Sequence, residues 1–119
     1  MRFMMIYKPA DLSGLEGGVP PSQQEMAQMG AFIDELAQAG VLLATDGLMG
    51  SAAGARVKQA DGKVTVTDGP FTEAKELIGG FALLEVKSKE EALELARRFV
   101  AIAGDGTSEI RALANPTSR

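Results

Sequence analysis

Residues 2–8, Arg-Phe-Met-Met-Ile-Tyr-Lys, form a short run of mainly apolar side chains that stops at Pro9. Such a run predicts a β-strand, because it is too short for a helix and proline cannot continue a strand's hydrogen-bond ladder. Apolar side chains occupy both of its alternating faces, which is typical of a strand covered on both sides. We therefore expect a first strand that is buried on both faces.

Two helices are predicted by capping boxes, in which a serine oxygen accepts a first-turn amide and a glutamate reaches back to the serine's own amide. The first box, Ser22 to Glu25, opens a helix expected over residues 23–39, and the second, Ser88 to Glu91, opens one that ends at the glycines of residues 104–106. Each helix is apolar on one side only, as expected of a helix that covers a sheet. The predicted core side of the first helix comprises Met26, Met29, Phe32, Ile33, Leu36 and Ala37.

Further strands are predicted between and after the helices. Residues 55–60 and 63–67 flank Asp61-Gly62, a dipeptide that favours a two-residue hairpin turn. This turn sets Val57 opposite Val66 and gives the hairpin one largely apolar and one basic face. The other strands are expected at residues 41–48, 81–86 and 107–114, with a loop over 11–21 and a small-residue linker over 50–54.

This order of elements predicts an α+β chain of the ferredoxin-like split βαβ type with an inserted β-hairpin. At 119 residues, the chain has the size of one domain, so residues 1–119 are taken as a single unit. Both helices can cover one face of a four-stranded antiparallel sheet, and the other face still needs a cover. A two-fold symmetric homodimer, sheet against sheet, is the simplest solution.

The composition excludes several kinds of chemistry. The chain has neither cysteine nor histidine, which removes the usual zinc sites, Ser-His-Asp triads and Cys-His pairs, and we expect no metal and no cofactor. With 12 basic and 16 acidic residues and no basic block, direct nucleic-acid binding is disfavoured. No apolar run approaches the ~20 residues of a membrane span and no signal-peptide pattern is present, so we expect a cytoplasmic protein that does not enter the membrane.

The segment from Val66 to Phe81, Val-Thr-Asp-Gly-Pro-Phe-Thr-Glu-Ala-Lys-Glu-Leu-Ile-Gly-Gly-Phe, resembles the signature of the DGPF-domain proteins, a branch of the YCII-related family. The stretch Gly40-Val41-Leu42-Leu43 and the second helix fit the same family, so the resemblance covers the whole chain. It implies a dimeric α+β barrel with ferredoxin-like subunits and a pocket near the sheet interface.

The same resemblance implies no single activity. Most members of the branch have no assigned reaction, and many look like companions of extracytoplasmic-function sigma factors in their gene neighbourhoods. Some YCII-related proteins resemble lyases or dehydrochlorinases that use a His-Asp pair. This chain has no histidine, so that pair cannot be carried over.

Asp68 is the first candidate for a functional side chain. One interpretation is structural: Asp68 accepts backbone amides in a turn, Gly69 takes a positive φ and Pro70 fixes the next dihedral angle. The other is catalytic: the turn presents the Asp68 carboxylate at the mouth of a cleft, where burial would raise its pKa into a useful range.

The remaining candidates also allow two interpretations. The charged residues after Asp68 form either a solvated turn of helix or a site with Lys75 as an anion anchor and Glu73 or Glu76 as a proton acceptor. Tyr7 either points its hydroxyl into an interface pocket or packs in the core with that hydroxyl satisfied. The full set of candidates is Asp68 and Glu73 for catalysis, and Tyr7, Met29, Phe71, Lys75 and Glu76 for ligand binding.

Two functions follow from these candidates. The first is a ligand-sensing or protein-interaction module that serves a transcription regulator, in which the pocket or the inserted hairpin binds without chemistry. The alternative is a cofactor-independent enzyme, with isomerase- or lyase-like proton transfer in a pocket at the dimer interface by Asp68, or by Glu73 or Glu76 in its place. The missing histidine and the lack of a visible nucleophile favour the first.

Overall fold

The computed structural model describes residues 1–11, 21–71 and 77–114. In chain order its elements are β1 (Arg2–Pro9), α1 (Gln23–Gln38), β2 (Leu42–Gly47), the 3-10 turn η1 (Ser51–Ala53), β3 (Ala55–Ala60), β4 (Lys63–Asp68), β5 (Gly80–Glu85), α2 (Lys89–Ala103) and β6 (Gly106–Ala112). The expected helices and strands are all present, with ends that differ by one or two residues. The turn η1 was not expected, and the helical turn predicted after Phe71 lies in residues 72–76, outside the described residues.

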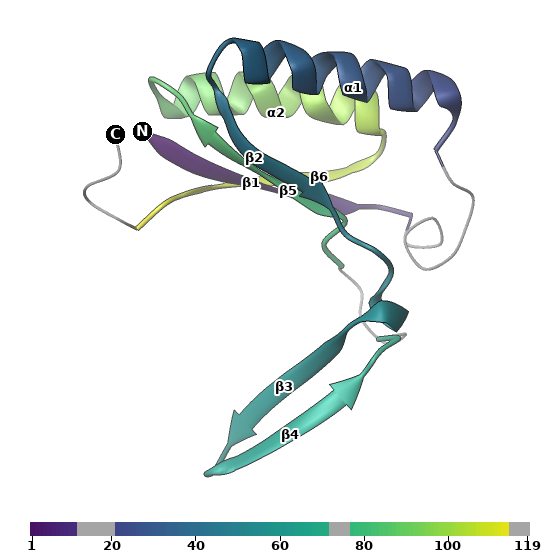
Figure 1. Ribbon diagram of the computed structural model, residues 1–119. Helices are drawn as coiled ribbons and strands as arrows, with labels where there is room; N and C mark the ends of the chain where they lie inside the picture. Colours follow the sequence, from purple (N-terminus) through teal and green to yellow (C-terminus); the bar gives the residue numbers. More distant parts are fainter. Residues whose placement is uncertain (12–20, 72–76, 115–119) are drawn as a thin grey trace.

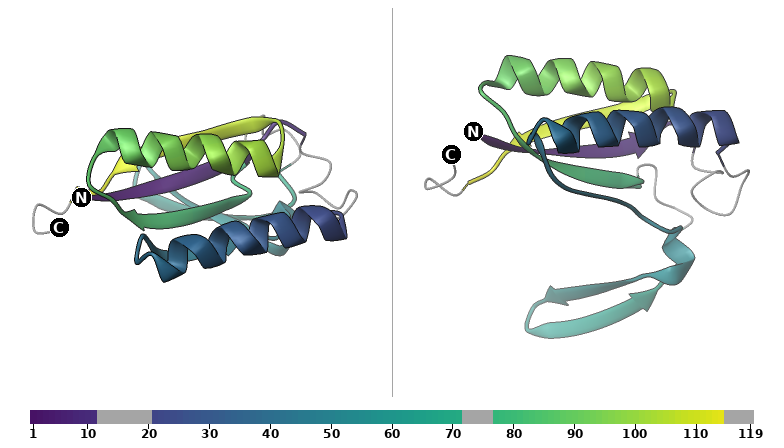
Figure 2. Two further views of the ribbon diagram at one scale, coloured as in Figure 1. Left: turned by 90° about the horizontal axis from the view of Figure 1, so that it is seen from above. Right: turned by 45° about the horizontal axis from the view of Figure 1, so that its top comes forward.

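The main sheet has four antiparallel strands in the order β2-β5-β1-β6. This is the strand order of a ferredoxin-like fold with the hairpin β3-β4 inserted between its second and third strands, so the predicted fold class is confirmed. Both helices lie on one face of the sheet (Figures 1 and 2). We call the opposite face, which the helices do not cover, the open face.

The hydrophobic core lies between the sheet and the two helices. Phe3 and Leu84 sit opposite each other on β1 and β5, and Leu84 is completely buried. The buried core residues are Phe3, Met5, Phe32, Leu36, Leu84, Val86, Ala92, Leu95 and Ala96.

The expected core side of α1 is wrong at two positions. Met26 is 55% exposed and Ala37 is exposed as well. Burial on this helix begins at Met29 and is complete only at Phe32 and Leu36, so the first turn of α1 contributes nothing to the core. Helical periodicity identifies the side of a helix that faces inward, whereas the length over which it meets the sheet depends on the tertiary packing.

The two helix starts use their serines differently. In α1 the predicted capping box is complete: Ser22 Oγ accepts the Glu25 amide at 3.1 Å, and the Glu25 carboxylate accepts the Ser22 amide at 3.3 Å. In α2 Ser88 Oγ accepts the Glu91 amide, but the Glu91 carboxylate accepts the amide of Lys87 at 2.9 Å instead. The second box is therefore only half correct, because neighbouring amides outside the helix compete for the same carboxylate.

The hairpin is built as the sequence predicts. Asp61 and Gly62 both have positive φ, 52° and 77°, which defines the two-residue turn, and Val57 lies opposite Val66. At its root the Gly69 amide donates to the Gly54 carbonyl at 2.9 Å.

The expected positive φ at Gly69 is wrong, since the positive-φ residues of the described chain do not include it. Glycine is needed there for space: a Cβ at this position would collide with the backbone carbonyl of Ser51. The root of the hairpin is therefore a close approach of two backbone segments rather than a left-handed turn.

The open face has an apolar centre and charged ends. Ion pairs lie at the two ends of this face. Glu85 pairs with the Met1 ammonium at 2.8 Å and with Arg2 at 3.1 Å. Glu109 pairs with Lys8 and with Arg111, both at 3.0 Å. The hairpin extends away from the sheet on the same side as the open face (Figure 1). Strand pairing places four apolar side chains in the centre of this face: Met4, Ile6, Phe81 and Leu83.

Candidate functional site

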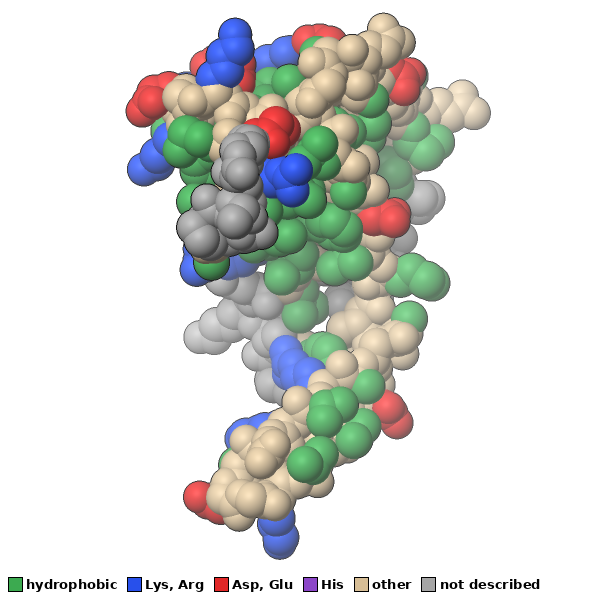
Figure 3. Space-filling model, turned by 60° about the vertical axis from the view of Figure 1, so that its left-hand side comes forward, with side chains coloured by type: hydrophobic (Ala, Val, Ile, Leu, Met, Phe, Trp, Pro, Cys, Tyr) green, Lys and Arg blue, Asp and Glu red, His purple; other side chains and the backbone are tan. Residues whose placement is uncertain are grey.

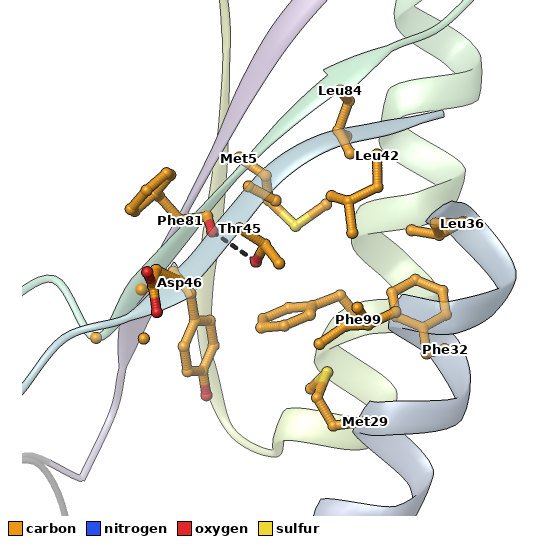
Figure 4. A pocket seen from close by; sticks show the side chains of 16 residues that line it. Met5, Met29, Phe32, Leu36, Leu42, Thr45, Asp46, Phe81, Leu84 and Phe99 are labelled. Carbon is orange, nitrogen blue, oxygen red and sulfur yellow. Dashed lines mark hydrogen bonds between the residues drawn. The ribbon is translucent and has the colours of Figure 1, made fainter. Parts of the chain in front are cut away.

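A cavity of about 460 Å³ lies between the sheet and the two helices. Met29 and Phe32 of α1 and Phe99 of α2 close it on the helical side, and Met5 and Leu42 contribute from the sheet (Figure 4). A space of this size is within the range of sites that hold small organic molecules. Most of its wall is hydrophobic, which suits an apolar ligand.

Among the described residues, two side chains bring hydroxyl groups to the cavity wall, Tyr7 and Thr45. The Thr45 hydroxyl donates to the Phe81 carbonyl at 2.8 Å. The Tyr7 hydroxyl lies 3.2 Å from the Gly104 carbonyl and 3.1 Å from the Asp105 carbonyl, and it donates to them. Both protons are thus committed to backbone oxygens, and neither is free to bond a ligand.

The Tyr7 ring is held in place from two sides. Phe99 meets it edge to face with the ring centroids 5.0 Å apart, a favoured aromatic geometry. Burial, and then the negative charge of Asp105, raise the pKa of Tyr7 above its ordinary value of 10.0. The phenol is therefore protonated at neutral pH and cannot serve as a base.

A β-bulge determines which side chains of β2 reach the cavity. The pairing of β2 with β5 shifts between Leu42 and Ala44, so that Leu43 is an extra residue. As a result Leu42 and Thr45 both lie on the helical side, although they are three positions apart. A regular strand continuing from Leu42 would instead turn Asp46 towards the helices.

Asp46 borders the cavity, but its carboxylate points elsewhere. Asp46 pairs with Phe81, which pairs with Ile6 on the open face. Figure 4 shows the side chains of Asp46 and Phe81 on the side of the strands away from Phe99 and Met29. Among the described residues, no carboxylate, ammonium or guanidinium group faces the cavity.

Glycines form the part of the cavity wall where β2 and β5 come together. A Cβ on Gly80 would lie 3.0 Å from the Asp46 carbonyl, and one on Gly79 would lie 3.1 Å from Cδ of Pro9. These are tight contacts that the two glycines avoid. The Gly79-Gly80 pair of the sequence motif thus allows the chain to pass beside β1 and β2 at the edge of the cavity.

Of the predicted ligand-binding residues, the structure brings Tyr7 and Met29 together on the cavity wall. The resemblance implies a pocket near the sheet interface, whereas this cavity lies on the helical side of the sheet within one chain. Tyr7 satisfies its hydroxyl internally, in agreement with the interpretation of a packed residue.

The other described candidates lie at the root of the hairpin. Asp68 ends β4 opposite Ala55, its side chain is exposed, and it does not line the cavity. Phe71 is half-buried, with its amide bonded to Ser51 Oγ at 2.9 Å and the Arg56 guanidinium 3.9 Å from its ring centre. Glu73, Lys75 and Glu76 lie outside the described residues.

Sequence reasoning did not select Thr45, Ala82 or Phe99 as site residues. The change from apolar to polar residues at Thr45 was a usable signal, because a polar group at the end of a buried strand needs a partner. Ala82 and Phe99 look like ordinary core residues in the sequence. Their role depends on a gap between helices and sheet that no local pattern reveals.

Two further properties concern the described part of the chain. No group of three or more acidic side chains is placed to hold a metal ion within residues 1–11, 21–71 and 77–114. Over the same residues, neither helix has the length and apolar character needed to cross a bilayer.

Comparison with known proteins places this geometry in a family. The YCII-related domain matches residues 1–114. An uncharacterised protein of Rhizobium meliloti (strain 1021) is 34% identical over 93 residues, which cover 77% of this chain and 75% of the relative. Taken with the ferredoxin-like fold, these matches show that the chain belongs to the YCII-related family.

Proposed function

We propose that this protein binds a small, uncharged, apolar molecule in the cavity between the sheet and the two helices. The observation that carries the proposal is the lining: a wall of Met, Leu, Phe and Gly residues with two hydroxyl groups whose protons are already bonded. A charged ligand would lose its hydration in this cavity and gain no counter-charge from the described residues of its wall, which is costly. An apolar ligand loses little and buries its surface.

Titration with two probes of the same shape, naphthalene and 2-naphthoate, tests the proposal. We expect naphthalene to shift the NMR signals of Met29, Thr45 and Phe99. Its affinity should be at least about tenfold higher than that of 2-naphthoate. A tenfold ratio corresponds to ~1.4 kcal/mol, and burying an unpaired carboxylate costs more than that. Equal affinities, or shifts confined to other parts of the chain, would refute it.

A pair of matched variants locates the binding site. Ala82→Leu adds methyl-bearing carbons inside the cavity, whereas Ala101→Leu adds the same atoms at an exposed position of α2. We expect Ala82→Leu to weaken naphthalene binding at least about fivefold while Ala101→Leu leaves it unchanged. Unaltered binding by both variants would place the ligand elsewhere.

We also propose that binding serves regulation rather than turnover, which is the role implied by the resemblance to companions of extracytoplasmic-function sigma factors. The cavity wall supports this choice, since the phenol of Tyr7 is protonated and no carboxylate of residues 1–11, 21–71 and 77–114 is directed inward. The enzymatic alternative with Asp68 or Glu73 as acid or base stays a prediction. The variant Asp68→Asn tests whether the hairpin root belongs to the binding site, as that alternative requires. Loss of naphthalene binding in this variant would connect the hairpin root to the cavity, and retention would separate the two.

The partner that we propose is a second copy of this chain. The apolar centre of the open face supports a homodimer, because Met4, Ile6, Phe81 and Leu83 lie on the side that neither α1 nor α2 covers. Light scattering coupled to gel filtration should then give about twice the chain mass of 12.5 kDa at micromolar concentration. A strictly monomeric protein would contradict this proposal and leave the cavity proposal standing.

A further inference from the structure

The hairpin β3-β4 carries a row of exposed apolar side chains. Val57, Val64 and Val66 are 71%, 62% and 66% exposed, and pairing puts them with Gln59 on one face. We call these four residues the valine face. Figure 3 shows hydrophobic side chains gathered along one side of the protruding hairpin, and Arg56, Lys58 and Lys63 alternate with them in sequence on the opposite face.

This hairpin receives little support from its own chain. Among the described elements, β3 and β4 pack extensively only against each other. An isolated two-stranded hairpin is at best marginally stable in water, and it becomes stable when a hydrophobic face is covered. Covering the valine face would therefore stabilise an element that otherwise depends, within the described residues, mainly on its turn, its ladder and the contact of Arg56 with Phe71.

We propose that the hairpin β3-β4 is an arm whose valine face packs against a second copy of this chain. This inference rests on the proposed homodimer and adds a specific contact to it. A copy seated on the open face lies on the side towards which the hairpin extends (Figure 1), so each hairpin reaches the other copy while its own open face is covered. By symmetry the contact occurs twice.

The amount of surface agrees with an arm of this kind. The chain exposes 8120 Å², about 1,900 Å² more than the ~6,200 Å² expected of a compact monomer of its mass. The radius of gyration is 16.0 Å, compared with about 13.5 Å for a compact chain of this length. A standard interface covers ~800 Å² on each partner, so the excess surface is more than such a dimer requires.

The charge distribution favours this chain as the occupant. Residues 55–68 hold three basic and two acidic residues, which gives the hairpin a charge of +1. Since the whole chain has a net charge of -4, the remaining residues carry -5. A positive arm is attracted to the negative body of a second copy.

Charge substitutions on the two faces of the hairpin test the proposal. Val64→Lys combined with Val66→Lys places two charges on the valine face, and Thr65→Lys combined with Thr67→Lys places the same charges on the opposite face. By analytical ultracentrifugation we expect the dimer dissociation constant of the valine variant to be at least about tenfold higher than that of wild type. The dissociation constant of the threonine variant should lie within about threefold of the wild-type value. Equal dimerisation by both variants would overturn the arm.

Thiol protection provides a second measurement that does not depend on disrupting the fold. The chain has no cysteine, so Val57→Cys and Lys58→Cys each introduce a single thiol, on the valine face and on the opposite face. At concentrations where the protein is a dimer, we expect maleimide to modify the Val57→Cys protein at least about tenfold more slowly than the Lys58→Cys protein. After dilution to the monomer, the two proteins should react at similar rates. Equal rates in a dimeric protein would refute the arm alone, whereas a monomeric wild type would refute both the arm and the homodimer.

Discussion

Ser108 shows how a single residue can be costly to the fold. Its hydroxyl is the only buried side-chain polar atom without a hydrogen-bond partner among the described residues. It lies on β6 opposite Tyr7, whose own hydroxyl reaches past it to the carbonyls after α2. A buried hydroxyl that loses its bonds to water without a replacement destabilises the folded state.

Replacing this serine should therefore be harmless or beneficial. We expect Ser108→Ala to leave the free energy of unfolding unchanged or to raise it by up to about 1 kcal/mol, because no bond is lost. The matched variant Ser88→Ala removes the cap of α2 and should lower it by ~1 kcal/mol. Urea unfolding of both proteins decides the matter. A loss in Ser108→Ala equal to that in Ser88→Ala would mean that the hydroxyl has a partner.

The hairpin turn depends on Gly62. This residue has a φ of 77°, a left-handed conformation that a β-branched side chain resists. We expect Gly62→Val to weaken the hairpin by about 1–2 kcal/mol, the usual cost of left-handed backbone. Amide exchange by NMR should show faster exchange in β3 and β4 but not in β1 or β5. Asp61→Asn is the control, since asparagine adopts this conformation readily, and unchanged exchange in Gly62→Val would contradict the turn.

At the scale of elements, one bidentate ion pair joins the two helices. Arg98 of α2 donates to both carboxylate oxygens of Glu35 of α1, at 2.9 and 2.8 Å, and its guanidinium lies 4.8 Å from the centre of the Phe32 ring. The arginine thus bonds to one residue of α1 and stacks on another. Its hydrogen bond is the main reason that the pKa of Glu35 lies below its ordinary value of 4.5.

This pair should contribute stability that depends on pH. Because the pKa of Glu35 is lowered by folding, its contribution is present above the ordinary value of 4.5 and disappears as the pH falls through the lowered pKa of the folded state. We expect wild type to be more stable than Glu35→Gln at pH 7 and the difference to shrink as the pH is lowered below 4.5. Denaturant unfolding over a series of pH values from 7 downwards measures it. The exposed Glu94, which pairs with Arg97 three residues away, is the control, and Glu94→Gln should show a smaller difference.

The elements that the sequence predicts well are those determined within a few residues. Asp61-Gly62 defines a turn and a register, and Ser22 with Glu25 defines a helix start, because each signal depends on backbone groups close in the chain. The bulge at Leu43 has no such signal. It depends on how Leu42 and Thr45 pack beneath the helices, which is a property of the folded sheet.

The candidate site was less predictable than the fold for the same reason. Met29 and Tyr7 were selected from the sequence, and both line the cavity, but Phe99 and Ala82 come from elements far away in the chain. Whether an apolar helix side fills the space above a sheet or leaves a gap depends on the sum of many side-chain volumes. Local periodicity does not contain this information.

At the scale of the whole molecule, the main sheet has one face that α1 and α2 cover and an open face that neither of these helices covers. A homodimer that covers the open face would make folding depend on concentration, because association stabilises only the folded chain. We expect the melting temperature to rise by about 3 °C for each tenfold increase in protein concentration, given a typical unfolding enthalpy per residue. Differential scanning calorimetry over two decades of concentration measures the rise.

The variant Leu83→Lys is the matched test of that dependence. Leu83 lies on β5 with its side chain on the open face, opposite Met4. A dimer would remove the charge of a lysine at this position from water, so we expect the Leu83→Lys protein to stay monomeric. Its melting temperature should then not vary with protein concentration. A wild-type protein whose melting temperature is independent of concentration would argue against the homodimer.

The bulge in β2 also has a consequence for protein engineering. Building an acid or base into a binding protein usually requires a new side chain, with new packing around it. Here Asp46 is already beside the cavity, one register step from facing it. If the bulge at Leu43 were removed, residues 44–47 would shift by one position along β5. Asp46 would then replace Thr45 in the cavity wall, with no change in the composition of the strand. The same sequence therefore holds a latent carboxylate, and the register of a single edge strand keeps it out of use.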